Sequence, residues 1–310
     1  VGFYFSHLDW SHPDYAPIPP NHRTGATMKD IYNSWPDGPQ NPHWQRFLAF
    51  HRSQLHELCA NYGPLDLLWF DGDWQPGPEY WQMGDLRNQL QAWQPNVILN
   101  GRLAGHGDYV TPEQGLPIVP PAGPWEFCVT LNDSWGYQPQ DHNYKSLRQI
   151  VRLFAECIGM GGNLLLDVGP KPDGTIPPEQ IALLESLGAW IHQHEEAIYP
   201  TTAGLPAGLF YGASTLSQDR KTLYLFTFDR PWEEIAVKGI RNPVKRASIL
   251  GSGRALKTYK RGGAPWVNVP GVLWLELPEA ELDPNATVVK LEFDEPLDLY
   301  TGSGISIQAN

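Results

Sequence analysis

Carboxylates follow apolar segments directly in this sequence, beginning with LLWFDGDW at residues 67–74. Four apolar residues lead there into Asp71, Gly72, Asp73 and Trp74. Such a run is typical of a buried strand, and a strand end is a rigid position for a reactive side chain. Gly72 permits an immediate turn and leaves room for a substrate beside Asp71. Alternatively, Asp71 caps a following helix.

Other predicted strands also carry polar residues near their ends. Residues 1–6, 96–102 and 163–169 read as strands ending at or near Ser6, Arg102 and Asp167, and strand 125–130 begins with Trp125 and Glu126. The loop after the second of these strands contains Glu113. In a (β/α) barrel the catalytic residues lie at the carboxyl ends of the strands. Two carboxylates suit glycoside hydrolysis: one attacks the anomeric carbon and the other protonates the leaving oxygen, about 5–5.5 Å apart in retaining enzymes.

The elements that would position these residues change in kind along the chain. Up to about residue 200, predicted strands alternate with helices at residues 42–62, 79–94, 144–160 and 177–198. This alternation predicts an α/β fold, either a (β/α) barrel of TIM type or a doubly wound sheet. Beyond it, strands are predicted at 222–228, 235–240, 246–251, 272–277 and 286–293. We therefore expect a catalytic barrel over 1–200 and an all-β sandwich over 201–310, with the boundary near 199–208.

Composition narrows the choice of partner. Among 310 residues, 22 are basic and 34 acidic, and the net charge of −12 argues against nucleic acid and anionic membranes. No apolar run reaches the roughly 20 residues of a membrane span. Three cysteines are too few for a disulfide framework or a zinc site, and we expect no metal and no cofactor. The 13 tryptophans, some beside acidic residues, favour a carbohydrate cleft because aromatic faces stack on sugars.

Six stretches of the first 200 residues resemble glycoside hydrolase family 29, the retaining α-L-fucosidases. They are VGFYFSHLDW, DLLWFDGDW, NGRL, GDYVTPEQ, PWEFCVTLNDSWGY and GGNLLLDVGPKPDGTIP, in the family's order. The resemblance implies a TIM-type barrel and hydrolysis of terminal α-L-fucose with retention. GDYVTPEQ and WEFCVTLNDSWGY are closer to the subgroup acting on α-1,3/1,4-linked fucose.

The resemblance also implies roles for particular residues. Asp71 matches the catalytic nucleophile and Glu113 the general acid/base, with Glu126 as the alternative acid. Arg102, Tyr4 and Trp69 match residues of the fucose pocket. Fucose carries a methyl group that should meet an aromatic wall, to which Trp135 or Tyr137 is a candidate contributor. His7 and His12 are candidates for the mouth of the cleft, whereas His51 and His56, five apart, do not share a helix face.

The sequence departs from the family in its number of strands. About five are predicted in residues 1–200 where the family has eight, and VGFYFS resembles the fourth, so the barrel is predicted to be incomplete at its N-terminus. The chain is interpreted as a fragment, as one part of a two-chain enzyme, or as a natural short form. An open sheet edge beside residues 1–6 favours pairing, so we expect a partner chain or a homo-oligomer to cover it.

The expected partner is a fucosylated oligosaccharide or glycoconjugate. Two other functions stay open: a fucose- or glycan-binding protein that has lost turnover, and another retaining glycosidase on the same barrel, such as an α-galactosidase-like enzyme. The cellular compartment is not readable from this sequence.

Overall fold

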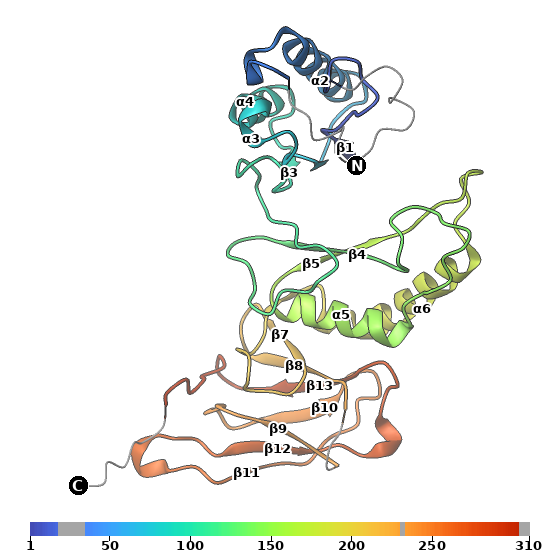
Figure 1. Cartoon of the computed structure of the whole chain (residues 1–310). Coiled ribbons are helices and arrows are strands. Elements are labelled where there is room, and N and C mark those ends of the chain that lie inside the picture. Colours follow the sequence, from blue (N-terminus) through green and yellow to red (C-terminus); the bar gives the residue numbers. More distant parts are fainter. Residues whose placement is uncertain (18–34, 230–232, 304–310) are drawn as a thin grey trace. The chain divides into compact units, whose positions relative to one another are not determined.

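The computed structural model describes residues 1–17, 35–229 and 233–303, which form two compact units (Figure 1). The first comprises Val1–Thr111 and Pro121–Trp125, and the second Pro112–Pro120 and Glu126–Asn310. The helices of the described residues are α2 (Pro42–Asn61), α3 (Pro78–Trp81), α4 (Met83–Trp93), α5 (Leu147–Gly159) and α6 (Pro178–His194), with short 3-10 helices at Gly38–Gln40, Glu195–Ala197, Pro265–Val267 and Glu279–Glu281. None of these helices is both long and apolar enough to cross a membrane.

Three parallel strands form the sheet of the first unit, in the order β1 (Gly2–Ser6), β2 (Leu67–Asp71) and β3 (Ile98–Leu99). Residues of a strand alternate between its two faces. Leu68 and Phe70 are fully buried in one core cluster with residues of α2 and α4. The other face carries Trp69 and Asp71, which are paired in register with Tyr4 and Ser6 of β1. The strand therefore anchors one face in the core and presents the predicted site on the other.

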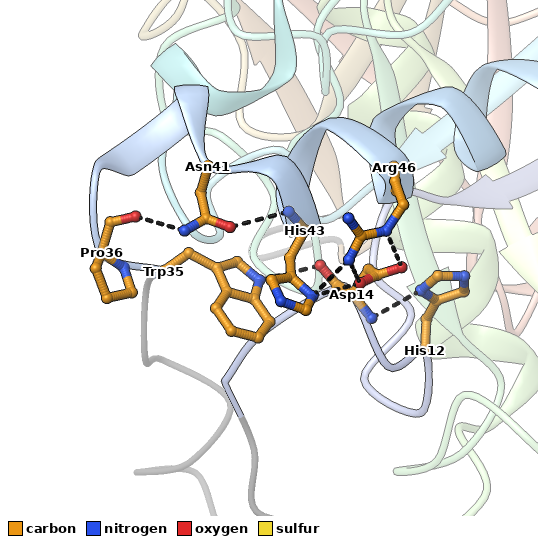
Figure 2. Close-up of polar contacts among 7 residues, drawn as sticks. All are labelled: His12, Asp14, Trp35, Pro36, Asn41, His43 and Arg46. Atoms are coloured by element: carbon orange, nitrogen blue, oxygen red, sulfur yellow. Dashed lines mark hydrogen bonds and ion pairs between the residues drawn. The ribbon is translucent and has the colours of Figure 1, made fainter.

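The N-terminal end of α2 is fixed by polar contacts, drawn in Figure 2. Asn41 caps the helix by accepting a 2.9 Å hydrogen bond from the His43 N–H. Asp14 accepts hydrogen bonds from Arg46 (2.7 Å) and pairs with His43, and the Arg46 contact lowers the pKa of Asp14. Trp35 stacks on the His43 ring at 4.2 Å and donates to the Asp14 carbonyl oxygen. These contacts orient a helix that carries His51 to the sheet.

The second unit begins with two parallel strands, β4 (Glu126–Thr130) and β5 (Asn163–Asp167), paired so that Thr130 lies opposite Asp167. Helix α5 starts with a capping box in which Ser146 and Gln149 exchange side-chain-to-backbone hydrogen bonds. Its buried side chains share a cluster with α6 and with the antiparallel sheet that follows.

The remaining strands of the second unit are antiparallel. Their bounds are β6 (Thr201–Ala203), β7 (Ala213–Ser217), β8 (Thr222–Thr227), β9 (Glu234–Val237), β10 (Arg246–Ile249), β11 (Thr258–Arg261), β12 (Val272–Glu276) and β13 (Thr287–Glu292). They form a five-stranded sheet, β10-β13-β8-β7-β6, and a three-stranded sheet, β11-β12-β9. In β8, Leu223 and Leu225 pack between the sheets, whereas Tyr224 and Phe226 pack in the cluster shared with α5 and α6. This strand is therefore buried on both faces (Figure 1).

The prediction of α/β structure followed by antiparallel β structure is confirmed, with local corrections. The helix expected over 79–94 is two helices, α3 and α4, because Gln82 adopts a left-handed backbone conformation (φ 52°). The strand expected over 96–102 is only Ile98–Leu99. Strands β6, β7 and β11 were not predicted. Five strands are parallel among the described residues, in groups of three and two, and the incomplete barrel stays a prediction.

Candidate active site

Asp71 is the last residue of β2, and the chain turns away from the strand immediately after it. Gly72 has φ +91°, and a Cβ at this position would lie 2.4 Å from Leu8 Cγ. A residue with a side chain would therefore be strained and would displace Leu8. Glycine lets the backbone leave the sheet at once, so that the Asp71 carboxylate stands at the carboxyl end of a rigid parallel strand.

Each oxygen of the Asp71 carboxylate has a donor. Arg102 Nη1 donates to Oδ1, and Tyr4 Oη donates to Oδ2 at 2.9 Å. Burial, followed by the contact with Asp71, raises the pKa of Tyr4 to about 12, so the phenol keeps its proton and acts as a donor at neutral pH. The side chains of Arg102 and Asp71 are 15 % and 25 % exposed, and this charge pair is therefore only partly screened by water. The two donors therefore fix the orientation of the carboxylate.

Aromatic side chains form a wall beside this pair. The Arg102 guanidinium carbon lies 4.6 Å from the ring centre of Trp69 and 5.9 Å from that of Trp74. Tyr4 stacks on Trp69 with ring centres 5.7 Å apart and an interplanar angle of 22°. Tyr4 and Trp74 are more than half exposed, whereas Trp69 is buried. The first unit thus brings together four predicted residues, Asp71, Arg102, Tyr4 and Trp69, as a carboxylate, a cation and an aromatic surface open to a ligand.

Two further polar side chains fix the backbone around Asp71. The fully buried Asn100 accepts from the Phe70 N–H (2.8 Å) and donates to the Phe70 carbonyl oxygen (2.9 Å), which extends the pairing of β2 with β3 by one residue. Asp73 accepts from the Ala104 N–H at 2.7 Å and holds the loop after Arg102. The sequence showed both polar residues beside strand ends, but the partners of Asn100 were not predictable from it.

The expectation that His7 lines the mouth of the cleft is wrong. His7 is 1 % exposed and lies against the buried His51, with 3.0 Å between His7 Nδ1 and His51 Nε2. Burial lowers the pKa of His7 to about 4 and the pKa of His51 well below its ordinary value, so both rings are neutral at pH 7. His12 is half-buried and stacks on Phe50 at 4.7 Å.

The other predicted site residues belong to the second unit. Glu113 lies in a short extended segment bridged in parallel to Cys128 of β4, where the Gln114 N–H donates to the Cys128 carbonyl oxygen at 2.9 Å. This bridge lies outside the named strands, so the segment is a loop, as predicted. Its pairing with β4 was not predicted, because the GDYVTPEQ sequence lacks an apolar run. Trp135 follows β4 and is 41 % exposed.

Glu126 and Asp167 lie at opposite ends of the β4-β5 pair. Glu126 is the first residue of β4, opposite Asn163, and so lies at the amino end of the parallel pair. Its charge acts on the buried Cys157 thiol of α5, whose pKa is raised to about 12, mainly by burial. Asp167 ends β5, and burial raises its pKa to about 6. Of these two carboxyls, only Asp167 lies at the end of the strands where parallel α/β folds place their chemistry.

The described parts of both units contain no group of three or more histidine, cysteine, aspartate or glutamate side chains placed to hold a metal ion. The chemistry available at Asp71 is that of an oriented carboxylate beside a guanidinium, a phenol and indole faces. This combination provides a nucleophile and a sugar-binding surface for covalent catalysis, which also needs a second carboxyl group as acid/base.

Comparison with known proteins identifies the family to which the chain belongs. A family profile described as "Alpha-L-fucosidase" matches residues 1–196. The chain therefore belongs to the α-L-fucosidase family, glycoside hydrolase family 29.

Both curated sequences and solved structures resemble the chain. It is 28 % identical to an α-L-fucosidase of Branchiostoma floridae over 87 % of this chain and 58 % of that protein, and 26 % identical to one of Dictyostelium discoideum over 81 % and 54 %. The structure of α-L-fucosidase isoenzyme 1 from Paenibacillus thiaminolyticus superposes with a TM-score of 0.80 at 33 % identity, covering 95 % of this chain and 72 % of that one. A family 29 enzyme of Bacteroides thetaiotaomicron gives 0.75 at 25 % identity, covering 94 % and 67 %. The chain spans about half the length of the curated relatives it matches.

Proposed function

We propose that this protein acts as a retaining exo-α-L-fucosidase that removes terminal α-L-fucose from glycans by double displacement. The observation that carries the proposal is the Asp71 carboxylate, oriented by Arg102 and Tyr4 at the end of a parallel strand within the family-matched region. The similar Bacteroides thetaiotaomicron enzyme is described as a trapped covalent intermediate with 2-fluoro-fucosyl fluoride. A covalent intermediate in that protein supports a nucleophilic carboxylate here.

In the first proposed step, an Asp71 oxygen attacks the anomeric carbon and the bond to the leaving oxygen breaks. Glu113 supplies the proton that the leaving oxygen takes up. In the second step a water molecule attacks the same carbon, Glu113 accepts the proton of the water, and the bond to Asp71 breaks. Arg102 and Tyr4 orient the Asp71 carboxylate for the attack, and their hydrogen bonds stabilise it again as it leaves.

We assign the acid/base role to Glu113 in preference to Glu126. Glu113 is paired alongside the middle of β4, whereas Glu126 lies at the amino end of β4 and beside Cys157 of α5. The proposed substrate-binding residues are Tyr4, Trp69, Arg102 and Trp135, and Glu126 stays the alternative acid. The exposed Trp135 is proposed to contribute to the aromatic wall that meets the fucose methyl group. The fucose removed is proposed to be α-1,3- or α-1,4-linked.

Two structural proposals accompany this function. Residues 1–200 serve as the catalytic barrel and residues 201–310 as a β-sandwich that supports it.

Among the residues the structure describes, β1 pairs with β2 on one side only. We propose that a strand supplied by a partner chain or by a second copy covers its other edge. Light scattering tests this, and a stable, monodisperse monomer without bound partner would contradict it.

The test of the function is hydrolysis of a panel of aryl glycosides, with the anomer of the released sugar followed by NMR. Hydrolysis of the α-L-fucoside with release of the α-anomer is expected. Release of the β-anomer would contradict retention, and preference for an α-galactoside would indicate another retaining glycosidase. Binding of fucose without turnover would indicate a glycan-binding protein.

A further inference from the structure

A buried row of hydrogen bonds lies behind the Asp71–Arg102 pair, entirely within the first unit. It runs from Arg52 on α2 through His51 to His7, and from His7 to the main chain of Arg102. His7 Nε2 is 3.1 Å from the Arg102 carbonyl oxygen, and the His7 backbone N–H donates to the Asp71 carbonyl oxygen at 2.8 Å. One residue therefore bonds to the main chain of both members of the pair.

The chemistry of the end groups fixes every proton in this row. The Arg102 carbonyl oxygen only accepts, so His7 Nε2 carries a hydrogen. The neutral His7 ring then accepts at Nδ1, and His51 Nε2 must donate to it. His51 Nδ1 in turn accepts from Arg52 Nη1 at 3.2 Å, because a guanidinium only donates. Each ring thus has a single tautomer, with its hydrogen on Nε2.

Packing holds the His7 ring in the orientation that these bonds require. The ring stacks on Phe70 with centres 4.8 Å apart and an interplanar angle of 3°. The ring centre of Trp81 lies 5.2 Å from that of His7, and Arg52 donates to the Trp81 carbonyl oxygen at 2.5 Å. The ring cannot turn without breaking its stack on the residue that precedes Asp71.

We propose that His7 is a positioning residue for the fucosidase reaction: its Nε2–H, oriented by His51, fixes the main chain at Arg102 and thereby the guanidinium against Asp71. The catalytic part of this inference rests on the proposed function. His7 does not touch the reacting atoms. It joins the end of β2, which carries the nucleophile, to the turn after β3, which carries the cation. A shift of the Arg102 backbone would therefore become a shift of the guanidinium.

Two amide substitutions separate the two hydrogen bonds of His7. In His7→Gln the side-chain amide nitrogen occupies the position of Nε2 and still donates to the Arg102 carbonyl oxygen. In His7→Asn the amide reaches only the position of Nδ1, which keeps a contact with His51 and loses the one with Arg102. We expect His7→Gln to retain kcat within about 3-fold and His7→Asn to lose about 10- to 100-fold, mainly in kcat. His56→Gln, which changes an exposed histidine on α2, the helix that carries His51, is the matched control and should equal the parent.

Loss of kcat in His7→Asn with an unchanged thermal midpoint supports the positioning role. Equal kcat in the Gln and Asn variants, or losses that follow the thermal midpoint instead of the retained bond, would overturn it. Ring ¹⁵N spectra of the parent at pH 7 provide a reading that needs no activity: neutral Nε2–H forms are expected for His7 and His51, and a protonated or Nδ1–H form of His7 would overturn the inference.

If the parent protein hydrolyses no α-fucoside, the proposed function is refuted, but the positioning of Arg102 by His7 can still be tested. In that case the ring spectra and a crystal structure of His7→Asn decide it. Displacement of the Arg102 guanidinium from Asp71 in the variant would support the inference, and an unchanged contact would refute it.

Discussion

The buried histidine pair predicts a specific loss of stability in acid. His7 has a pKa of about 4 in the folded protein, against an ordinary value of 6.5, because burial penalises the charged ring. The neighbouring Arg52 lowers the pKa further, whereas the Arg102 carbonyl and the Asp71 charge oppose the shift. Between these two pH values the unfolded chain binds a proton that the folded chain does not. Stability therefore is fully present above pH 6.5 and falls as the pH drops towards 4.

The size of the effect follows from the two pKa values. Between pH 7.5 and pH 5.0, protonation of His7 in the unfolded state lowers the free energy of unfolding by about 2 kcal/mol. In His7→Phe this contribution is absent, and the aromatic contact with Phe70 is kept. Urea unfolding of parent and variant at the two pH values gives the difference, in which the titrating groups that do not interact with His7 cancel.

The parent should therefore lose about 2 kcal/mol more than His7→Phe between pH 7.5 and pH 5.0. His56→Phe on the exposed face of α2 should show the same pH dependence as the parent. If His7→Phe and the parent lose equal stability, His7 is not held neutral by burial and the reasoning about its tautomer is refuted.

Three further changes have expected outcomes. Arg102→Met should lower kcat/KM about 10- to 100-fold because Asp71 loses a charge-assisted hydrogen bond worth about 1.5–3 kcal/mol, and a loss below 3-fold in aryl-fucoside hydrolysis would contradict this. Burial raises the pKa of Asp167 from 3.8 to about 6, so ionisation of this group costs the folded protein at most about 3 kcal/mol, and partial exposure reduces the cost to about 1 kcal/mol. Asp167→Asn should therefore stabilise the protein above pH 6. Urea unfolding should show no gain in stability below pH 4. Glu113→Gln should lose hydrolysis of fucosides with poor leaving groups more than of activated ones, whereas Glu126→Gln should lose neither, and the reverse ranking would exchange their roles.

The strands that position the site were predictable because their signals are local. The apolar run before Asp71 specifies a buried strand, and the glycine after it specifies a turn, whatever the rest of the chain does. The pairing of the Glu113 segment with β4 was not predicted, because it involves only a few residues and the segment lacks such an apolar run. The break at Gln82 also gave no signal, since a left-handed residue other than glycine is not readable from sequence.

Contacts between distant residues could not be derived from pattern. The resemblance implied that Arg102 and Asp71 belong to one fucose pocket, whereas their spacing in the chain carries no geometric information. The burial of His7 was missed for a physical reason. A histidine near a strand end is ordinarily solvated, and the two groups that satisfy its buried ring, His51 and the Arg102 carbonyl oxygen, are distant in the sequence.

The central claim is that Asp71 is the nucleophile of an α-L-fucosidase, and one measurement tests it most directly. Hydrolysis of an aryl α-L-fucoside is measured for the parent and for Asp71→Gly, with and without azide. Turnover by the parent, its loss in the variant, and recovery by azide with formation of a β-fucosyl azide are expected, because azide attacks from the face that the carboxylate leaves vacant. Undiminished turnover by Asp71→Gly would contradict the account.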